Sequence, residues 1–100
     1  MNIKLKANEN IGELYIEGRL DSNSYLEAEN IFMKMTERFN ILILDFARLE
    51  YVSSAGLRTL KKINVAMKQK GGELTIRHVN KMVMEVFEMT GFIGILKVEK

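Results

Sequence analysis

The run Ile41-Leu42-Ile43-Leu44 constrains the fold more than any other stretch of this sequence. A strand with one covered face alternates apolar and polar side chains, whereas a strand of a parallel sheet is covered on both faces and is apolar throughout. We therefore predict that the segment from Ile41 to Phe46 is a buried strand. Because parallel neighbours are joined by long connections, usually helices, this strand indicates an α/β fold.

The segments before this run predict an edge hairpin and a helix. Apolar residues alternate with others over 3–7 and again over 11–17, where Leu14 and Ile16 share one face. This period of two is typical of half-buried strands, and the polar residues 8–10 favour an antiparallel turn between them. Helical spacing then predicts a helix, capped by Ser22 or Ser24, whose apolar face consists of Ala28, Ile31, Phe32, Met35 and Phe39.

The segment directly after the buried strand predicts a loop and the central helix of the chain. We expect the loop over 47–52, with Leu49 directed inward. The helix is expected to run from Ser54 to about Lys70, and Gly71-Gly72 supplies the left-handed conformation that ends it. Its inner side should contain Gly56, Leu60, Ile63 and Met67.

The last thirty residues complete a βαβ pattern. A strand is expected at 74–77, then a helix capped by Asn80 and ended by Gly91. Residues 95–98 are expected to form a short closing strand or an apolar tail that lies on the sheet. The predicted order is ββαβαβα(β). We therefore expect an α/β fold, a single domain over residues 1–100, with about three main helices and a mainly parallel sheet edged by an antiparallel hairpin.

The overall composition argues against several classes of function. A net charge of +2 with scattered Lys and Arg gives no reason to expect nucleic-acid binding. Cysteine is absent, which removes disulfides, thiol catalysis and thiolate metal sites. No apolar run reaches the roughly 18 residues of a membrane span, and residues 1–6 lack the apolar core of a signal peptide. We expect a cytoplasmic protein with no membrane partner.

The residues that could support catalysis are few. Asp21, Asp45 and the Ser53-Ser54 pair are expected at the carboxyl edge of the sheet, where sites gather in α/β folds. A nucleophilic serine needs a base within hydrogen-bond reach, and the one histidine, His78, belongs to no Gly-x-Ser-x-Gly elbow. Metal clusters and phosphate loops are also missing. Structural roles for the two aspartates are therefore favoured, and we expect no catalytic residue, metal or cofactor.

The start of the central helix is the most distinctive feature for function. Small residues occupy its first turn, where backbone N–H groups are free and the helix dipole is positive. A hydroxyl held there is exposed and well placed to carry negative charge. We interpret Ser54 as a regulatory phosphorylation site on a protein-binding domain.

The sequence resembles the STAS domain of bacterial anti-sigma factor antagonists over nearly its whole length. The resemblance rests on Gly18-Arg19-Leu20-Asp21, Leu44-Asp45-Phe46, Gly71-Gly72-Glu73-Leu74 and, most specifically, the segment from Leu49 to Leu57. That family carries an Asp-Ser-(small)-Gly motif whose serine is phosphorylated by an anti-sigma factor that is also a kinase. The target serine falls on Ser54, and the family's preceding Asp is replaced by Ser53.

The resemblance implies partner switching, in which the unmodified protein binds the anti-sigma factor and the phosphorylated protein releases it. It also places Asp21 at an acidic position close to the serine. The implied partner-binding residues are Asp21, Ser53, Ser54, Ala55, Gly56, Leu57 and Arg58.

Two alternatives remain open at this point. One is a STAS subunit of a transporter or signalling complex that is not phosphorylated, which the replacement at Ser53 suggests. The other is an enzyme or nucleotide-binding protein that uses Asp21 and Asp45 near Ser54.

Overall fold

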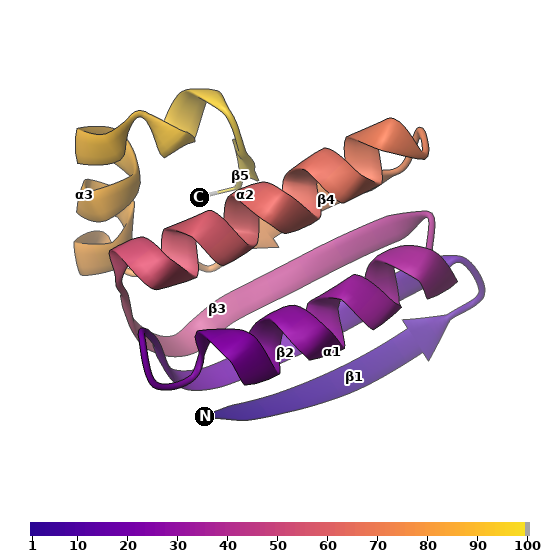
Figure 1. Ribbon diagram of the computed structural model, residues 1–100, viewed down its shortest axis with the longest axis horizontal. Coiled ribbons are helices and arrows are strands. Elements are labelled where there is room, and N and C mark those ends of the chain that lie inside the picture. The colour runs from indigo at the N-terminus through magenta and orange to yellow at the C-terminus, as the bar shows by residue number, and fades with distance from the viewer. Residues whose placement is uncertain (100) are drawn as a thin grey trace.

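A computed structural model describes residues 1–99, and its elements follow the predicted order (Figure 1). The alternation of strands and helices confirms the α/β class and the ββαβαβα(β) order. The elements are β1 (Asn2–Asn8), β2 (Ile11–Leu20), α1 (Tyr25–Arg38), β3 (Ile41–Val52), α2 (Ser54–Gln69), β4 (Glu73–Arg77), α3 (Lys81–Thr90), a 3-10 turn (Phe92–Gly94) and β5 (Lys97–Val98).

The sheet has the order β1-β2-β3-β4-β5. The β1–β2 pair is antiparallel, with Asn8 opposite Ile11, and the three other pairs are parallel. The predicted edge hairpin and the mainly parallel sheet are therefore confirmed. The apolar run of β3 lies in the centre of the sheet between two parallel neighbours, but only its alternate residues Leu42 and Leu44 are buried in the core. Ile41 and Ile43 are only partly buried on the opposite face, so the expectation of a strand covered on both faces is wrong.

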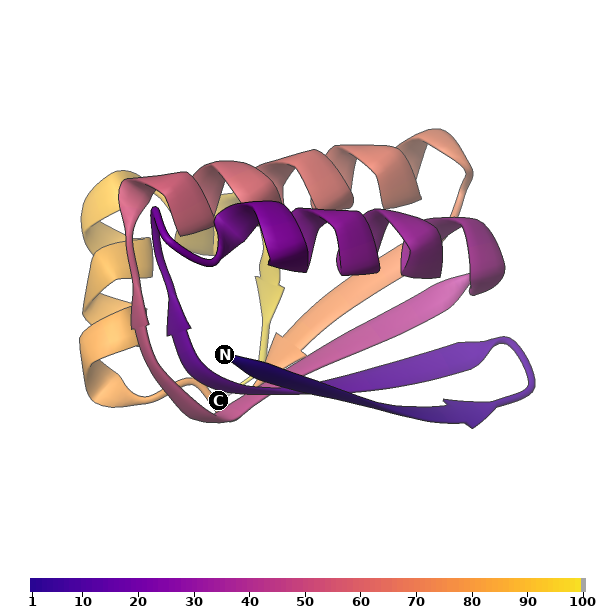
Figure 2. The ribbon, with the colours of Figure 1, turned by 60° about the horizontal axis from the view of Figure 1, so that its bottom comes forward.

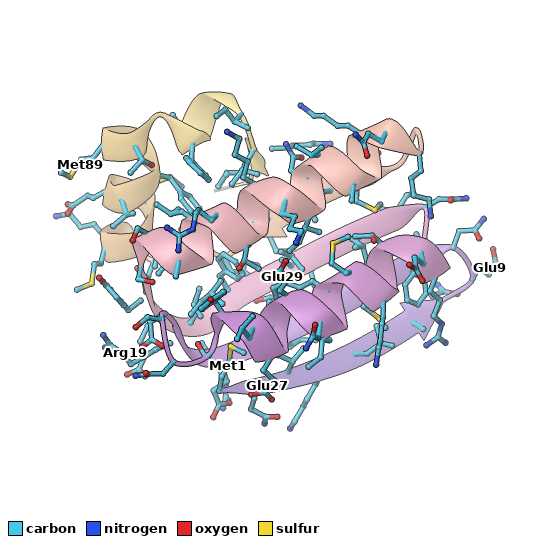
Figure 3. The ribbon with its side chains drawn as sticks, viewed as in Figure 1. Met1, Glu9, Arg19, Glu27, Glu29 and Met89 are labelled. Carbon is cyan, nitrogen blue, oxygen red and sulfur yellow. The ribbon has the colours of Figure 1, made fainter. Side chains whose placement is uncertain are left out.

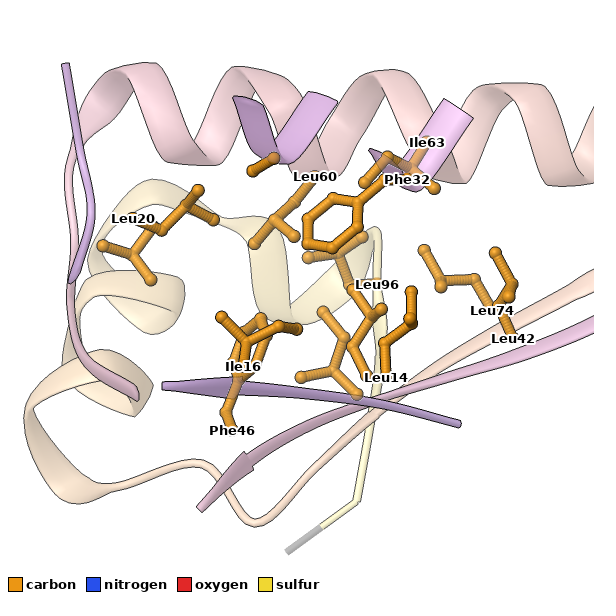
Figure 4. Close-up of a cluster of buried hydrophobic side chains, with 14 of the residues drawn as sticks. Leu14, Ile16, Leu20, Phe32, Leu42, Phe46, Leu60, Ile63, Leu74 and Leu96 are labelled. Carbon is orange, nitrogen blue, oxygen red and sulfur yellow. The ribbon is translucent and has the colours of Figure 1, made fainter. Parts of the chain in front are cut away.

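Two helices, α1 and α2, lie side by side on one face of the sheet, and α3 lies at the end of the sheet (Figures 1 and 2). The opposite face, turned downward in Figure 2, carries no helix. Fully buried side chains fill the space between the helices and the sheet, as Figure 4 shows. This core includes Leu14, Ile16, Phe32, Leu42, Leu44, Phe46, Leu60 and Ile63.

The predicted loop over 47–52 is wrong, because β3 continues to Val52 and remains paired with β2. The register between the two strands shifts twice, once between Tyr15 and Glu17 and once between Gly18 and Arg19. Such bulges bend a strand while most of its pairing is kept. Leu49 is buried, as predicted. Because β3 is long, α2 begins at the far end of the bent sheet (Figure 2).

Two further expectations need correction. The first strand was expected to be half-buried, but Leu5 is 39% exposed and Ala7 is exposed, so within β1 only Ile3 packs against the core. Ser24 precedes α1, but its side chain makes no cap hydrogen bond. Its hydroxyl instead accepts from the Asp21 N–H and donates to the carbonyl of Arg19. Ser24 is therefore the N-cap residue, as predicted, but its hydroxyl stabilises the turn before the helix and not the first turn of the helix.

Candidate functional site

The two serines at the start of α2 have different roles. Ser53 is the N-cap, and its Oγ accepts from the Gly56 N–H at 3.4 Å. Its own N–H donates to the carbonyl of Leu20 at 2.9 Å, which ties α2 to the end of β2. Ser54 is the first residue of the helix, and its side chain is exposed. The sequence therefore placed the exposed hydroxyl correctly at Ser54, and the structure shows that Ser53 is held by hydrogen bonds.

Gly56 is required by the close approach of β2 to α2. A Cβ built at this position would lie 2.6 Å from the carbonyl oxygen of Leu20, a backbone atom that cannot move aside cheaply. Its neighbours Ala55 and Leu57 are buried. Leu57 belongs to the hydrophobic core, whereas Ala55 is 5% exposed and lines a small surface hollow with Arg58. These three residues hold the first turn in place, and their contact with a partner stays a prediction.

Asp21 lies next to this turn, because it follows the Leu20 carbonyl that receives the Ser53 N–H. Its carboxylate accepts from the backbone N–H of Asn23 at 3.0 Å and pairs with Arg19 at 3.4 Å. The Asn23 N–H, with further help from Arg19 and Ser24, holds the pKa of Asp21 below its usual range. Asp21 is therefore an ionised carboxylate at the same end of the molecule as Ser54.

Two arginines give this end of the molecule a mixed charge. The Arg19 guanidinium lies 4.6 Å from the centre of the Tyr51 ring, and Figure 3 shows Arg19 at the end where α2 begins. Arg58 is exposed one turn after Ser54. Side chains four residues apart are neighbours on a helix surface, so Ser54 and Arg58 share one exposed face. Ser54 thus shares an exposed helix face with a cation, and the acidic Asp21 belongs to the neighbouring turn, which the Ser53 N–H joins through the Leu20 carbonyl.

Asp45 does not join this group. It lies in the middle of β3, in register with Tyr15 on β2 and Arg77 on β4. Its side chain is only 5% exposed and faces away from α1 and α2, because the alternate residues Leu44 and Phe46 fill the core. The expectation that Asp45 shares one sheet edge with Asp21 and the serines is therefore wrong, since β3 continues seven residues beyond it.

The Asp45 carboxylate is fully occupied by donors. It accepts from the Ala47 N–H at 3.0 Å, from Arg77 Nε at 3.0 Å and from His78 Nδ1 at 2.9 Å. Burial raises the pKa of this carboxyl, but the three donors outweigh burial and hold the pKa below its usual value. The Ala47 bond spans the bulge in β3, so the favoured structural role for Asp45 agrees with its contacts.

Tyr15, Glu13 and Arg77 extend this network over the helix-free face. The Tyr15 hydroxyl donates to Glu13 at 2.8 Å, and this bond raises the pKa of the phenol. Arg77 contacts the Tyr15 hydroxyl at 3.3 Å and Glu13 at 3.6 Å. The members of this cluster come from three different strands, so no local sequence pattern predicts that they lie together.

The arrangement does not support serine chemistry. His78 contacts Asp45 on the helix-free face, whereas Ser54 lies at the start of α2. Over residues 1–99, no three His, Asp or Glu side chains are grouped in a way that could hold a metal ion. Within the same residues, none of the helices combines the length and the apolar character needed to cross a membrane.

Comparisons with known proteins identify the fold. The family model of the STAS domain matches residues 2–100. BtrV of Bordetella bronchiseptica, whose name describes an anti-sigma factor antagonist, is 42% identical over 57 residues, which is 57% of this chain and 49% of BtrV. The chain thus matches about half the length of that curated relative.

Three solved structures share the fold at low identity. A protein of Thermotoga maritima, described as an anti-sigma factor antagonist, has a TM-score of 0.91 at 17% identity, covering 98% of this chain and 86% of that one. SpoIIAA of Bacillus in its phosphorylated form has a TM-score of 0.76 at 14% identity, covering 99% and 92%. A sulfate transporter family protein of Wolinella succinogenes has a TM-score of 0.79 at 17% identity, covering 93% and 79%.

Proposed function

The chain belongs to the STAS domain family, and on this premise we propose that it is an anti-sigma factor antagonist controlled by phosphorylation of Ser54. In its unmodified form it binds a kinase-type anti-sigma factor through Asp21 and the first turn of α2 with its cap, residues 53–58, in which Ser54 and Arg58 are exposed. Phosphorylation of Ser54 by that partner releases it. The observation that carries the proposal is the exposed Ser54 hydroxyl at the first position of α2, a helix whose start is hydrogen-bonded to the residue before the ionised Asp21. The name of BtrV supports the same class.

The structure favours Ser54 over Ser53 as the acceptor. Ser53 Oγ caps the helix, and replacing such a cap costs about 0.5–2 kcal/mol of stability. A kinase acting on Ser53 would have to disrupt this contact. Ser54 makes no side-chain hydrogen bond within the described residues, so its hydroxyl is available without cost.

Charge is sufficient to produce the switch. Transfer of the γ-phosphoryl group of ATP to Ser54 Oγ releases ADP and a proton and adds about −1.5 to −2 charge. At the N-terminus of its own helix this charge is stabilised by only about 0.3–1 kcal/mol. A partner carboxylate at ~4 Å would be repelled by about 4 kcal/mol per unit charge at an effective dielectric constant near 20. That energy corresponds to about a thousandfold loss of affinity, without a large conformational change.

The proposal is tested by incubating the protein with its cognate kinase and ATP, followed by mass spectrometry. Phosphate is expected on Ser54, and Ser53→Ala should still be modified. Ser54→Ala should bind the partner constitutively, whereas Ser54→Asp should bind much more weakly. Phosphate on Ser53 alone, or a Ser54→Asp protein that binds as tightly as wild type, would contradict the proposal.

A second candidate is a STAS subunit that is not phosphorylated, for example in a transporter complex. The specific observation is Ser53, which stands where the motif has Asp and serves here as a helix cap. Pull-down from native extract with unmodified and Ser54→Asp baits separates the two functions. A partner recovered equally by both baits favours the subunit, and a histidine-kinase-like protein recovered only by the unmodified bait favours the antagonist.

A further inference from the structure

A hollow of about 490 Å³ lies on the helix-free face, at the first bulge of β3. This is the face turned downward in Figure 2, away from α1 and α2. Its walls come from β1, β2 and β3 and from the residue that follows β4. They include Lys4, Tyr15, Glu17, Asp45, Arg48 and His78. The volume falls within the roughly 300–1,000 Å³ of small-molecule sites in proteins.

The carboxylates in this hollow are already occupied. Asp45 is 5% exposed and receives three donors. Glu17 pairs with Arg48 at 3.5 Å. The buried Asp45 therefore offers no free acceptor to a cationic ligand, whereas Glu17 is 54% exposed and has Arg48 as its partner.

Cationic groups are accessible in the same hollow. Arg48 is 80% exposed, so most of its N–H groups face solvent even while it pairs with Glu17. Lys4 lies directly across from Tyr15 on the adjacent strand, and it makes no ion pair with any residue in the described part of the chain. Directly opposed residues project to the same face of a sheet, so the side chains of Lys4 and Tyr15 share the helix-free face and both line the hollow.

His78 is held at the rim by an unusual backbone conformation. Its φ is +58°, which costs free energy for a residue with a side chain. Its Nδ1 contacts the buried Asp45, which fixes the ring and leaves Nε2 facing outward from a side chain that is 58% exposed. Residues in such sparsely populated backbone conformations cluster at functional sites. His78 does not belong to the Ser54 surface, so the proposed phosphorylation switch does not account for this conformation.

From these observations we propose that the hollow binds a small organic carboxylate. Its charged end meets the Lys4 ammonium and the free N–H groups of Arg48, and its apolar body packs on the Tyr15 ring and the Ala47 methyl group. The carboxylate class follows from accessible cations next to carboxylates that are already paired. The site is separate from the Ser54 surface, so neither proposal depends on the other.

The test is a titration of the ¹⁵N-labelled full chain with benzoate, followed by two-dimensional NMR at pH 7. Saturable shifts are expected at the amides of Tyr15, Ala47 and His78. Benzamide, which has the same shape without charge, and acetate, which lacks the apolar body, should both bind at least several-fold more weakly.

The matched variants are Lys4→Gln and Lys6→Gln. Both lysines are exposed on the same face of β1, but only Lys4 lines the hollow. Lys4→Gln should weaken benzoate binding about fivefold, the scale of an exposed ion pair, while Lys6→Gln should leave it unchanged. Shifts that do not saturate overturn the proposal. The proposal is also overturned if benzamide or acetate binds as tightly as benzoate, or if Lys4→Gln and Lys6→Gln change benzoate binding equally.

Discussion

The backbone N–H of Ser53 donates to the carbonyl of Leu20 at 2.9 Å, which joins the start of α2 to the end of β2. The same carbonyl lies 2.6 Å from the place where a Cβ of Gly56 would stand. The carbonyl oxygen of Leu20 thus fixes the distance between the turn that contains Asp21 and the first turn of α2. The geometry of the proposed partner surface depends on this contact.

Gly56→Ala should destabilise the protein by about 1–3 kcal/mol, because the added methyl group forces Leu20 and α2 apart. Urea unfolding followed by circular dichroism measures the change. Gly94→Ala is the control, since nothing lies within 4 Å of a Cβ at that position. A Gly56→Ala protein as stable as wild type would show that the turn tolerates separation from β2.

Ser53→Ala should lower the unfolding free energy by about 1 kcal/mol, because it removes the cap of α2. Ser54→Ala should change stability by less than about 0.5 kcal/mol, since its exposed hydroxyl makes no hydrogen bond in the described residues. Thermal unfolding of the two variants side by side provides the comparison. The reverse order of stabilities would contradict the roles assigned to the two serines.

Asp45→Asn should cost about 2–3 kcal/mol at pH 7, because Arg77 and His78 would then share a neutral partner. The pKa of Asp45 is lowered in the folded protein, so the unfolded chain binds its proton first as the pH falls. The stability that ionised Asp45 contributes is therefore present above its unfolded pKa, about 3.9, and is lost as the pH falls through the folded value.

Urea midpoints at pH 7 and at pH 3 measure this linkage. The difference in stability between wild type and Asp45→Asn should narrow at the lower pH. Glu50→Gln is the control, because Glu50 is an exposed carboxylate on the same strand. An unchanged difference at pH 3 would mean that the charge of Asp45 contributes nothing.

Phosphoserine at position 54 should draw in Arg58, which lies four residues later on the exposed face of α2. The second pKa of the phosphate should then be lower than in an Arg58→Gln protein by roughly 0.3. Phosphoserine can be introduced during translation, so the measurement by ³¹P NMR requires neither kinase nor partner. Lys68→Gln, in the last turn of the same helix, should leave the pKa of the phosphate unchanged. If Lys68→Gln and Arg58→Gln changed this pKa equally, the effect would come from the overall charge of the protein and not from contact with Arg58.

Local signals in the sequence predicted much of the fold. Asn80 caps α3 by accepting from the Val83 N–H, and Gly91 ends that helix with φ of +78°. Gly71, with φ of +76°, follows α2 as expected. These features depend on residues within one helical turn, and the sequence contains all of them.

The pairing of distant strands was less accessible to sequence analysis. The segment 47–52 does alternate apolar and polar residues, with Arg48 and Glu50 on either side of Leu49, and the predicted loop overlooked this strand signal. What the alternation does not show is that the segment pairs with β2 across two bulges. The cluster of Tyr15, Asp45 and Arg77 brings together residues 30 or more positions apart. Contacts between residues so far apart in the chain cannot be predicted from a local pattern of apolar and polar residues.

By itself, the sequence determined the α/β order of the chain and the exposed Ser54 at the first turn of α2. Helix caps, glycine stops and apolar periods act over a few residues, so they can be read directly from the chain. Tertiary structure alone decided that Asp45 is buried in the middle of the sheet, and that β3 continues through residues 47–52 beside β2. Burial depends on which strand lies beside which, and that choice is made by packing across the whole sheet.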